Sequence, residues 1–133
     1  MRRRLAIHVA RIAALPAGFE ELCADATADG QRLLDVLRED FATGAGLFAV
    51  LAGDALLGIG GVTRDPYLKG EAAARLRRLY IRRSARRHGA GRALVEAIVA
   101  AARDAGWPRL RVRAPAGAFA FYEACGFLRA VGE

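Results

Sequence analysis

The sequence has few of the residues that build disulfides or metal sites. Its 133 residues include two cysteines, Cys23 and Cys125, and two histidines, His8 and His88. No Cys-x-x-Cys or His-x-x-x-His spacing connects them, which argues against a disulfide framework and a zinc site. We therefore expect no bound metal, and we expect both thiols to be buried and chemically inert.

Long apolar runs are also missing. No run approaches the roughly 18 apolar residues that a membrane-spanning helix needs. Three arginines follow Met1, as in a secretory signal, but His8 and Arg11 interrupt the next segment and no cleavage site follows. We therefore expect a cytoplasmic protein without a membrane partner. The length and an apolar fraction of 54% are typical of one globular domain over residues 1–133.

Acidic residues are scarce in the second half of the chain. Residues 66–133 contain fourteen basic and five acidic residues, whereas residues 1–65 contain seven and nine. The segment 75–92 contains eight arginines and no acidic residue. Such a block attracts a polyanion, and nucleic acid, an acidic membrane surface or a phosphate-bearing cofactor would each fit it.

The periodicity of the apolar residues predicts a mixed α/β domain. A strand near residues 5–9 precedes two helical sets, the second formed by Leu33, Leu34, Leu37 and Phe41. A helix between two strands predicts a crossover that leaves those strands parallel. The remaining elements are expected as strands over 47–51, 55–62, 74–82, 110–114 and 127–131, and as helices over 90–105 and 119–124.

The strongest local signal is a glycine-containing loop, Arg86–Arg92, between a predicted strand and a predicted helix. Glycines let the backbone approach a ligand, and a helix start offers unpaired N–H groups to phosphate oxygens. A P-loop would need Gly-Lys-Ser/Thr, but Gly91 is followed by Arg92 and Ala93. A dinucleotide fingerprint would need a third glycine where Leu94 stands.

The segment from Arg75 to Phe127 resembles the GNAT superfamily of acyl-CoA-dependent N-acetyltransferases. The run from Arg86 to Gly91 matches the family's pyrophosphate motif, Arg/Gln-x-x-Gly-x-Gly/Ala, and follows a Leu-Tyr-Ile strand. Ala118 and the run Phe121–Phe127 are similar to the family's Ala-x-x-Phe-Tyr-x-x-x-Gly-Phe ending. Residues 60–68 also resemble bacterial members of undefined substrate, whereas residues 1–45 match only in element order.

The resemblance implies a mostly antiparallel sheet that is splayed around the coenzyme, and transfer of an acetyl group from acetyl-CoA to a primary amine by direct attack. Tyr122 would protonate the departing thiolate, a role suited to a hydroxyl whose pKa is similar to that of the thiol. The main chain would hold the pantetheine arm at Leu79, Tyr80 and Ile81, with one N–H stabilising the oxyanion. The pyrophosphate would lie against Arg86, Arg87, His88, Gly89, Ala90, Gly91 and Arg92.

Each assignment has an alternative. Leu79 and Ile81 are also suited to a buried strand, and Tyr122 can be a packed aromatic residue without a chemical role. A non-catalytic acyl-CoA sensor fits the same loop. A nucleic-acid-binding module would use the basic segment 75–92, but Tyr80 is its only aromatic residue for stacking on bases.

The chain departs from the family where a general base is expected. Arg75 stands where relatives place a glutamate, and Arg111 is nearest to a second such position. Pro115 lies close to the place of an asparagine that helps to hold the coenzyme. Asp65 and Glu71 are weak candidates for the general base, which is therefore unassigned. The two arginines favour an acceptor amine that carries a negative charge.

The end of the sequence predicts a homodimer. Six residues follow Phe127, which is enough for one strand, so the family's seventh strand is expected to be absent. An uncovered sheet edge is a template for pairing, and closed two-fold dimers are the commonest oligomers. Light scattering at micromolar concentration should give about twice the chain mass of 14.2 kDa. A monomer that still turns over acetyl-CoA would contradict this expectation.

Overall fold

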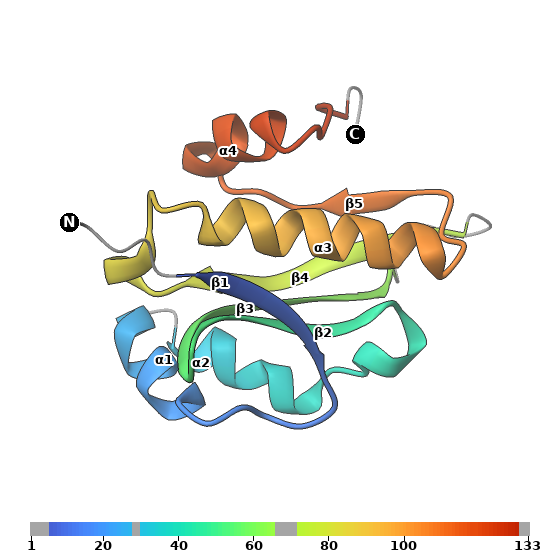
Figure 1. The fold of residues 1–133 in the computed structure, drawn as a ribbon. Helices are drawn as coiled ribbons and strands as arrows, with labels where there is room; N and C mark the ends of the chain where they lie inside the picture. Colours follow the sequence, from blue (N-terminus) through green and yellow to red (C-terminus); the bar gives the residue numbers. More distant parts are fainter. Residues whose placement is uncertain (1–5, 28–29, 66–71, 131–133) are drawn as a thin grey trace.

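A computed structural model describes residues 6–27, 30–65 and 72–130, and a five-stranded sheet runs through it in the order β1-β2-β3-β4-β5 (Figure 1). The first four strands pair antiparallel and β5 pairs parallel to β4. The strands are β1 Ile7–Ile12, β2 Gly46–Ala52, β3 Ala55–Arg64, β4 Ala74–Ile81 and β5 Leu110–Val112. This is the predicted α/β fold class.

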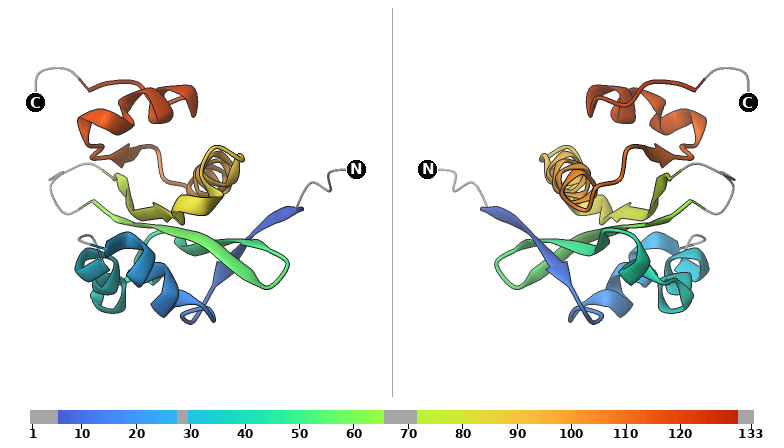
Figure 2. Two further views of the ribbon diagram at one scale, coloured as in Figure 1. Left: turned by 90° about the vertical axis from the view of Figure 1, so that its left-hand side faces the viewer. Right: turned by 90° about the vertical axis from the view of Figure 1, so that its right-hand side faces the viewer.

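Helices cover both faces of the sheet (Figure 2). On one face lie α1 (Phe19–Ala26) and α2 (Gly30–Leu34), and on the other lies the long helix α3 (Ala90–Asp104). The crossover β4-α3-β5 makes the two strands parallel, as the sequence predicts. The short helix α4 (Phe119–Ala124) follows β5. Within the described ranges, no helix is long and apolar enough to cross a membrane.

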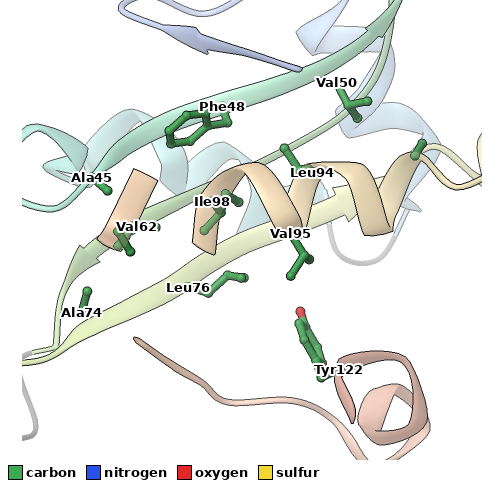
Figure 3. Close-up of a cluster of buried hydrophobic side chains, with 12 residues drawn as sticks. Ala45, Phe48, Val50, Val62, Ala74, Leu76, Leu94, Val95, Ile98 and Tyr122 are labelled. Atoms are coloured by element: carbon green, nitrogen blue, oxygen red, sulfur yellow. The ribbon is translucent and has the colours of Figure 1, made fainter. Parts of the chain in front are cut away.

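The core is divided by the sheet into two clusters. Leu94, Val95 and Ile98 of α3 are fully buried against Val50 of β2 and Val62 of β3 (Figure 3). Val95 and Ile98 follow Leu94 by one and four positions, which places all three on one face of the helix. This periodicity is why the sequence predicts the helix well. The second cluster joins α1 and α2 to the opposite face, with Leu22 and Ile59 fully buried.

A one-residue bulge interrupts β4. Ile59 is paired with Tyr80 and Gly61 with Arg77, so Arg78 and Leu79 together face Gly60. Arg78 has a φ of 57°, in the left-handed region that residues with side chains rarely adopt.

The bulge changes which side chains face α3. Before it, Ala74 and Leu76 lie in the α3 cluster, and a regular strand would place residues 78 and 80 there. Beyond it, Leu79 and Ile81 pack on that cluster, whereas Tyr80 packs with α1 and α2.

The parallel pair β4–β5 is short. Ala74–Leu76 pair with Leu110–Val112, and from Arg77 onward β4 has no β5 neighbour in the described chain. The two strands therefore diverge from the point where the bulge begins. This divergence leaves one edge of β4 open toward α4.

Two sequence predictions are wrong in detail. The strand expected over 127–131 is absent from residues 127–130, and residue 131 lies outside the described part. Gly126 has a φ of 98° and the Phe127 N–H donates to the Tyr122 carbonyl at 3.0 Å, a capping arrangement that ends α4. The second helical set breaks after Leu34 into a 3-10 turn over Asp35–Arg38. Val36 is consequently buried, whereas Leu37 is 63% exposed.

The packing of α3 gives a stability prediction. Leu94→Ala should lower the free energy of unfolding by about 3 kcal/mol, because the site is fully enclosed and cannot collapse around the lost atoms. Arg103→Ala, on the exposed face of the same helix, should change it by less than about 0.5 kcal/mol. Urea unfolding of both variants measures the difference, and equal midpoints would contradict this account of the core.

Candidate active site

A cavity of about 480 Å³ lies where β4 and β5 diverge. Its walls include Leu33 of α2, Leu76 and Leu79 of β4, Val112 of β5 and Tyr122 of α4. Leu33 belongs to the core cluster on one face of the sheet, and Leu76 belongs to the cluster on the other face. The cavity therefore reaches through the sheet from the α2 side to the α3 side.

The open edge of β4 presents main-chain groups beside this cavity. The N–H of Arg82 donates to the Leu57 carbonyl of β3 at 2.7 Å. Because successive residues of a strand direct their main-chain groups to opposite edges, those of Ile81 and Leu79 point away from β3. The Ile81 carbonyl accepts a hydrogen bond there from Nε of Arg86 at 3.0 Å. This edge is suited to pairing with an extended ligand that carries amides.

The loop beyond β4 is shaped to hold an anion. A 3-10 turn over Arg83–Ala85 leads into it, and Arg87 and Gly89 then have φ values of 66° and 85°. Alternating left-handed residues turn main-chain N–H groups toward a common point, which is a known anion-binding arrangement. No side chain caps the start of α3, and the space around the Cα of Gly89 is open. The first N–H groups of α3 and its dipole therefore favour a bound phosphate.

Tyr122 closes the cavity from α4. Its side chain is buried and its hydroxyl points toward α3 near Val95 (Figure 3). The ring makes edge-on contacts with Phe121 and Phe127, with centroids 5.1 and 5.6 Å apart. Burial, with a smaller contribution from Cys125, raises the pKa of Tyr122 to about 12. The expectation of a pKa similar to that of a thiol is therefore wrong, although the hydroxyl keeps its proton at any working pH.

Comparison with known proteins decides the family. A model of the acetyltransferase (GNAT) family matches residues 15–127. The chain belongs to this family. A "putative acetyltransferase" from Exiguobacterium sp. 255-15 is 26% identical, with a TM-score of 0.79 over 96% of this chain and 89% of its own.

More distant structures share the GNAT fold. A transcriptional regulator from Bacillus halodurans C-125 has 21% identity and a TM-score of 0.73, over 96% of each chain. Glucosamine-6-phosphate N-acetyltransferase from Arabidopsis thaliana has 14% identity and a TM-score of 0.68, over 96% of this chain and 95% of its own. No curated protein matches the chain at a significant level.

Tyr80 anchors the end of β4 in this GNAT domain. Its hydroxyl donates to Oδ2 of Asp25 in α1 at 2.8 Å, and the Arg83 N–H donates to the same oxygen at 2.9 Å. These two bonds are the main reason that the pKa of Asp25 is lowered. The guanidinium of Arg86 lies over the Tyr80 ring, 5.3 Å from its centroid. The side chain of Tyr80 thus positions the loop from the α1 side, and its main chain is paired with Ile59 of β3.

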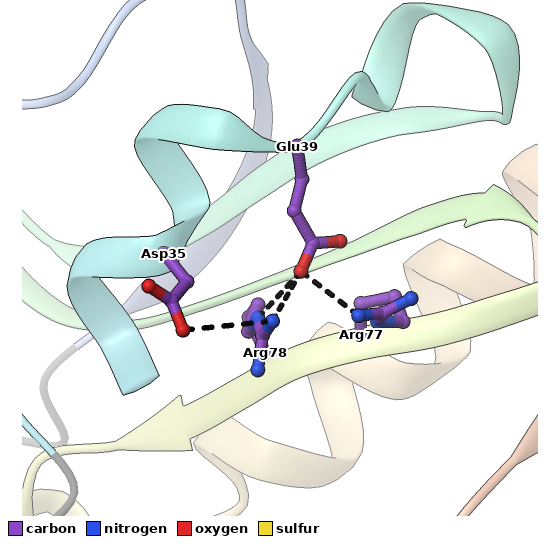
Figure 4. A network of polar contacts seen from close by, with 4 residues as sticks. All are labelled: Asp35, Glu39, Arg77 and Arg78. Carbon is purple, nitrogen blue, oxygen red and sulfur yellow. Dashed lines mark hydrogen bonds and ion pairs between the residues drawn. The ribbon is translucent and has the colours of Figure 1, made fainter. Parts of the chain in front are cut away.

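A carboxylate that sequence reasoning missed holds the bulge in place (Figure 4). Oε1 of Glu39 accepts from Arg77 at 3.0 Å and from Nε of Arg78 at 2.7 Å. Asp35 lies 4.0 Å from the Arg78 guanidinium. These side chains are largely shielded from water, with 13% exposure for Glu39 and 16% for Arg78. No local pattern signals this contact, because Glu39 and Arg78 are 39 residues apart.

Gly91 has a packing role that the sequence did not reveal. A Cβ at this position would lie 3.3 Å from Cζ of Phe121 and 3.5 Å from Cγ1 of Ile81. The glycine therefore lets α4 approach the loop, in addition to any space it leaves for a ligand. His88 and Arg92 are exposed, and Arg92 pairs with Glu96 one turn along α3 at 3.0 Å.

The described lining of the cavity contains no aspartate, glutamate or histidine. Asp65 is buried but lies elsewhere, and Glu71 is outside the described residues. Of the two arginines that the sequence places near the acceptor amine, Arg75 lines the cavity, whereas Arg111 lines a different groove beside Trp107. Arg113, which the sequence analysis did not single out, lines the cavity instead. In the described ranges, no group of three or more metal-ligating side chains is close enough to hold an ion.

The loop geometry gives a matched pair of variants for CoA binding. Gly91→Ala adds a methyl group that the family motif tolerates, so we expect it to bind CoA nearly as the wild type does. Gly91→Glu has the same contact with Phe121 but adds a carboxylate at the anion site, and we expect binding to be lost through repulsion. Calorimetry measures CoA affinity, and thermal unfolding shows that each variant is folded. Unchanged binding by a folded Gly91→Glu would contradict the assignment of this loop.

Proposed function

We propose that this protein transfers an acetyl group from acetyl-CoA to a primary amine by direct attack. The observation that carries the proposal is the divergence of β4 and β5, which opens a cavity lined by Leu79 of β4 and by Tyr122 of α4. A GNAT domain needs such an opening, because the thioester and the amine must meet inside the sheet. The acceptor would be a small molecule or a peptide, and the setting would be cytoplasmic.

The residues present fit acetyl-CoA, which would supply the acetyl group as an activated thioester. The main-chain groups of Leu79 and Ile81 at the open edge of β4 are suited to the amide-rich pantetheine arm, whereas those of Tyr80 between them face β3. The turned N–H groups of the loop Arg86–Arg92 are suited to the pyrophosphate, with arginine side chains around it. Preorganised N–H donors beside the cavity also stabilise negative charge that develops on a carbonyl oxygen.

Direct attack is supported by the position of the thiols. Neither cysteine is among the residues that line the cavity, and Cys125 lies in the groove beside Trp107. Cys23 and Cys125 are half-buried, so the expectation that both are buried is wrong. Partial burial is still the main reason that the pKa values of both thiols are raised, so both favour the unreactive thiol form. As the acceptor nitrogen bonds to the acyl carbon and the carbon–sulfur bond breaks, Tyr122 protonates the sulfur and recovers a proton from water. The acceptor amine releases its own proton to water.

The arrangement of arginines supports a cavity ligand in preference to nucleic acid. Arg77 and Arg78 face the cavity and are held by Glu39, whereas Arg86, Arg87 and Arg92 lie in the exposed loop at the other end of β4. The basic segment is thus divided between two places, and Tyr80 is turned toward Asp25. A homodimer remains part of the proposal because β5, as described, has no outer neighbour in the sheet.

A second candidate is a non-catalytic acyl-CoA sensor. The absence of a carboxylate or imidazole from the described lining favours it, because nothing there can draw the proton from an ammonium. Incubation of the protein with acetyl-CoA and a library of amines, followed by measurement of the free CoA released, distinguishes a sensor from an acetyltransferase. A sensor binds acetyl-CoA and releases no CoA with any amine, whereas an acetyltransferase releases CoA in proportion to acetylated product.

Substitution of Tyr122 tests its role as the acid. Tyr122→Phe should lower turnover about a hundred-fold, because a positioned acid contributes at least that much, and should leave CoA affinity unchanged. Phe121→Leu, beside it in α4, is the control for packing. A fall of less than about twofold in Tyr122→Phe would mean that the proton comes from another group.

The raised pKa of Tyr122 also predicts the pH profile. A phenol with a pKa of about 12 remains protonated at pH 10.5, whereas an ordinary tyrosine would be mostly ionised there. Turnover should therefore rise toward the pKa of the acceptor amine and show no decline up to pH 10.5. A decline that begins near pH 9, in a protein shown by circular dichroism to be folded, would contradict this reading.

A further inference from the structure

Five arginines line the cavity, and its described lining contains no acidic side chain. They come from three elements that are distant in sequence. Arg32 belongs to α2, Arg113 follows β5, and the other three, Arg75, Arg77 and Arg78, belong to β4. Arginines from three elements therefore line one chamber, which also has an apolar wall.

Three of these arginines already have partners. Glu39 accepts from Arg77 and Arg78, and Arg75 has an interaction of its own. Arg32 and Arg113 make no ion pair or hydrogen bond within the described part of the chain, and both are exposed. They lie on the α2 side and the β5 side of the opening, so their donors can meet a ligand that enters between them.

These two arginines lie far from the loop that is suited to the pyrophosphate. Val112 is paired with Leu76, which places Arg113 at the level of Arg77. Ile81 is four residues farther along β4, or about 13 Å at 3.3 Å per residue, and the loop begins beyond it. The chamber is therefore separate from the loop that is suited to the coenzyme's pyrophosphate.

We infer that the acceptor is a primary amine with a carboxylate or phosphate close to the amino group, and that Arg32 and Arg113 bind this anion. The inference rests on the proposed acetyl transfer and specifies its substrate class. Cationic acceptors without an anionic group, such as polyamines, are repelled by the same field. Arginine is suited to the task because its planar guanidinium can donate two parallel hydrogen bonds to a carboxylate or phosphate.

The same field bears on the proton of the acceptor amine, for which the described lining of the cavity offers no carboxylate or imidazole. A positive environment favours the neutral form of an amine, because it destabilises the ammonium ion. An acceptor held by its anion thus brings its amino group into a place where it loses its proton to water. The arginines therefore act on both groups of the substrate, binding the anion and promoting deprotonation of the amine.

Matched pairs of acceptors test the inference. The dipeptide amides Asp-Ala and Asn-Ala differ in one charge near the same α-amino group, and phosphoserine amide and serine amide differ in one phosphate. We expect kcat/KM to be about tenfold higher for each anionic member at low salt, with the preference reduced by 0.5 M NaCl. The two pairs distinguish a carboxylate acceptor from a phosphate acceptor, and a preference in either pair supports the inference.

Variants assign the preference to the two arginines. Arg32→Gln and Arg113→Gln should each reduce the ratio between anionic and neutral acceptors about tenfold, Arg113→Lys should keep part of it, and Arg113→Glu should invert it. Arg38→Gln is the control, because Arg38 is exposed on the turn after α2 and does not line the cavity. Thermal unfolding shows that the variants are folded.

The outcomes are separable. Equal kcat/KM within both pairs, with acetyl transfer intact, would overturn the inference and leave the proposed function standing. A fall in CoA affinity in Arg32→Gln or Arg113→Gln, measured by calorimetry, would assign these arginines to the coenzyme and also overturn it. Binding of acetyl-CoA without transfer to any amine would overturn the proposed function itself, and this inference with it.

Discussion

The contact between Glu39 and the two arginines of the β4 bulge is the interaction on which the rest of the site depends. Arg78 has a left-handed backbone that costs about 1 kcal/mol for a residue with a Cβ. Charge-assisted hydrogen bonds to a largely shielded carboxylate are strong enough to offset that cost. In a β4 without the bulge, residues 78 and 80 would face α3, and the open edge would present different main-chain groups.

The bulge and the short β5 act together. A parallel neighbour that continued beside Arg77 and Arg78 would use the N–H groups of β4 in ordinary sheet pairing, and no ligand could reach them. Because β5 is paired over three residues only, these groups border a cavity with an apolar wall, and electrostatic interactions there are screened less than on the surface. The fold thus leaves its sheet incomplete at one place and positions chemical groups around that gap.

Local patterns predicted most of the fold and part of the site. The hairpin β2–β3, helix α3 and the loop Arg86–Arg92 depend on spacing within a few residues, and the structure places them as expected. The role of Glu39 could not be predicted, because it depends on a contact across 39 residues. The pKa of Tyr122 and the packing of Gly91 against Phe121 depend on burial by elements distant in sequence. The prediction of a strand after Phe127 was wrong, because a pattern of apolar residues does not show whether a neighbouring strand is present to pair with it.

The carboxylate of Asp25 connects α1 to the start of the loop through one oxygen atom, which accepts from both Tyr80 and the Arg83 N–H. The loop therefore takes its position from a helix on the opposite face of the sheet. Local opening of α1 would remove both of these hydrogen bonds from the start of the loop. Those hydrogen bonds lower the pKa of Asp25. The link is therefore intact at any pH above the usual pKa range of a carboxyl group, and it is lost as the pH falls below that range. Acid would thus loosen the loop through a carboxylate that does not line the cavity.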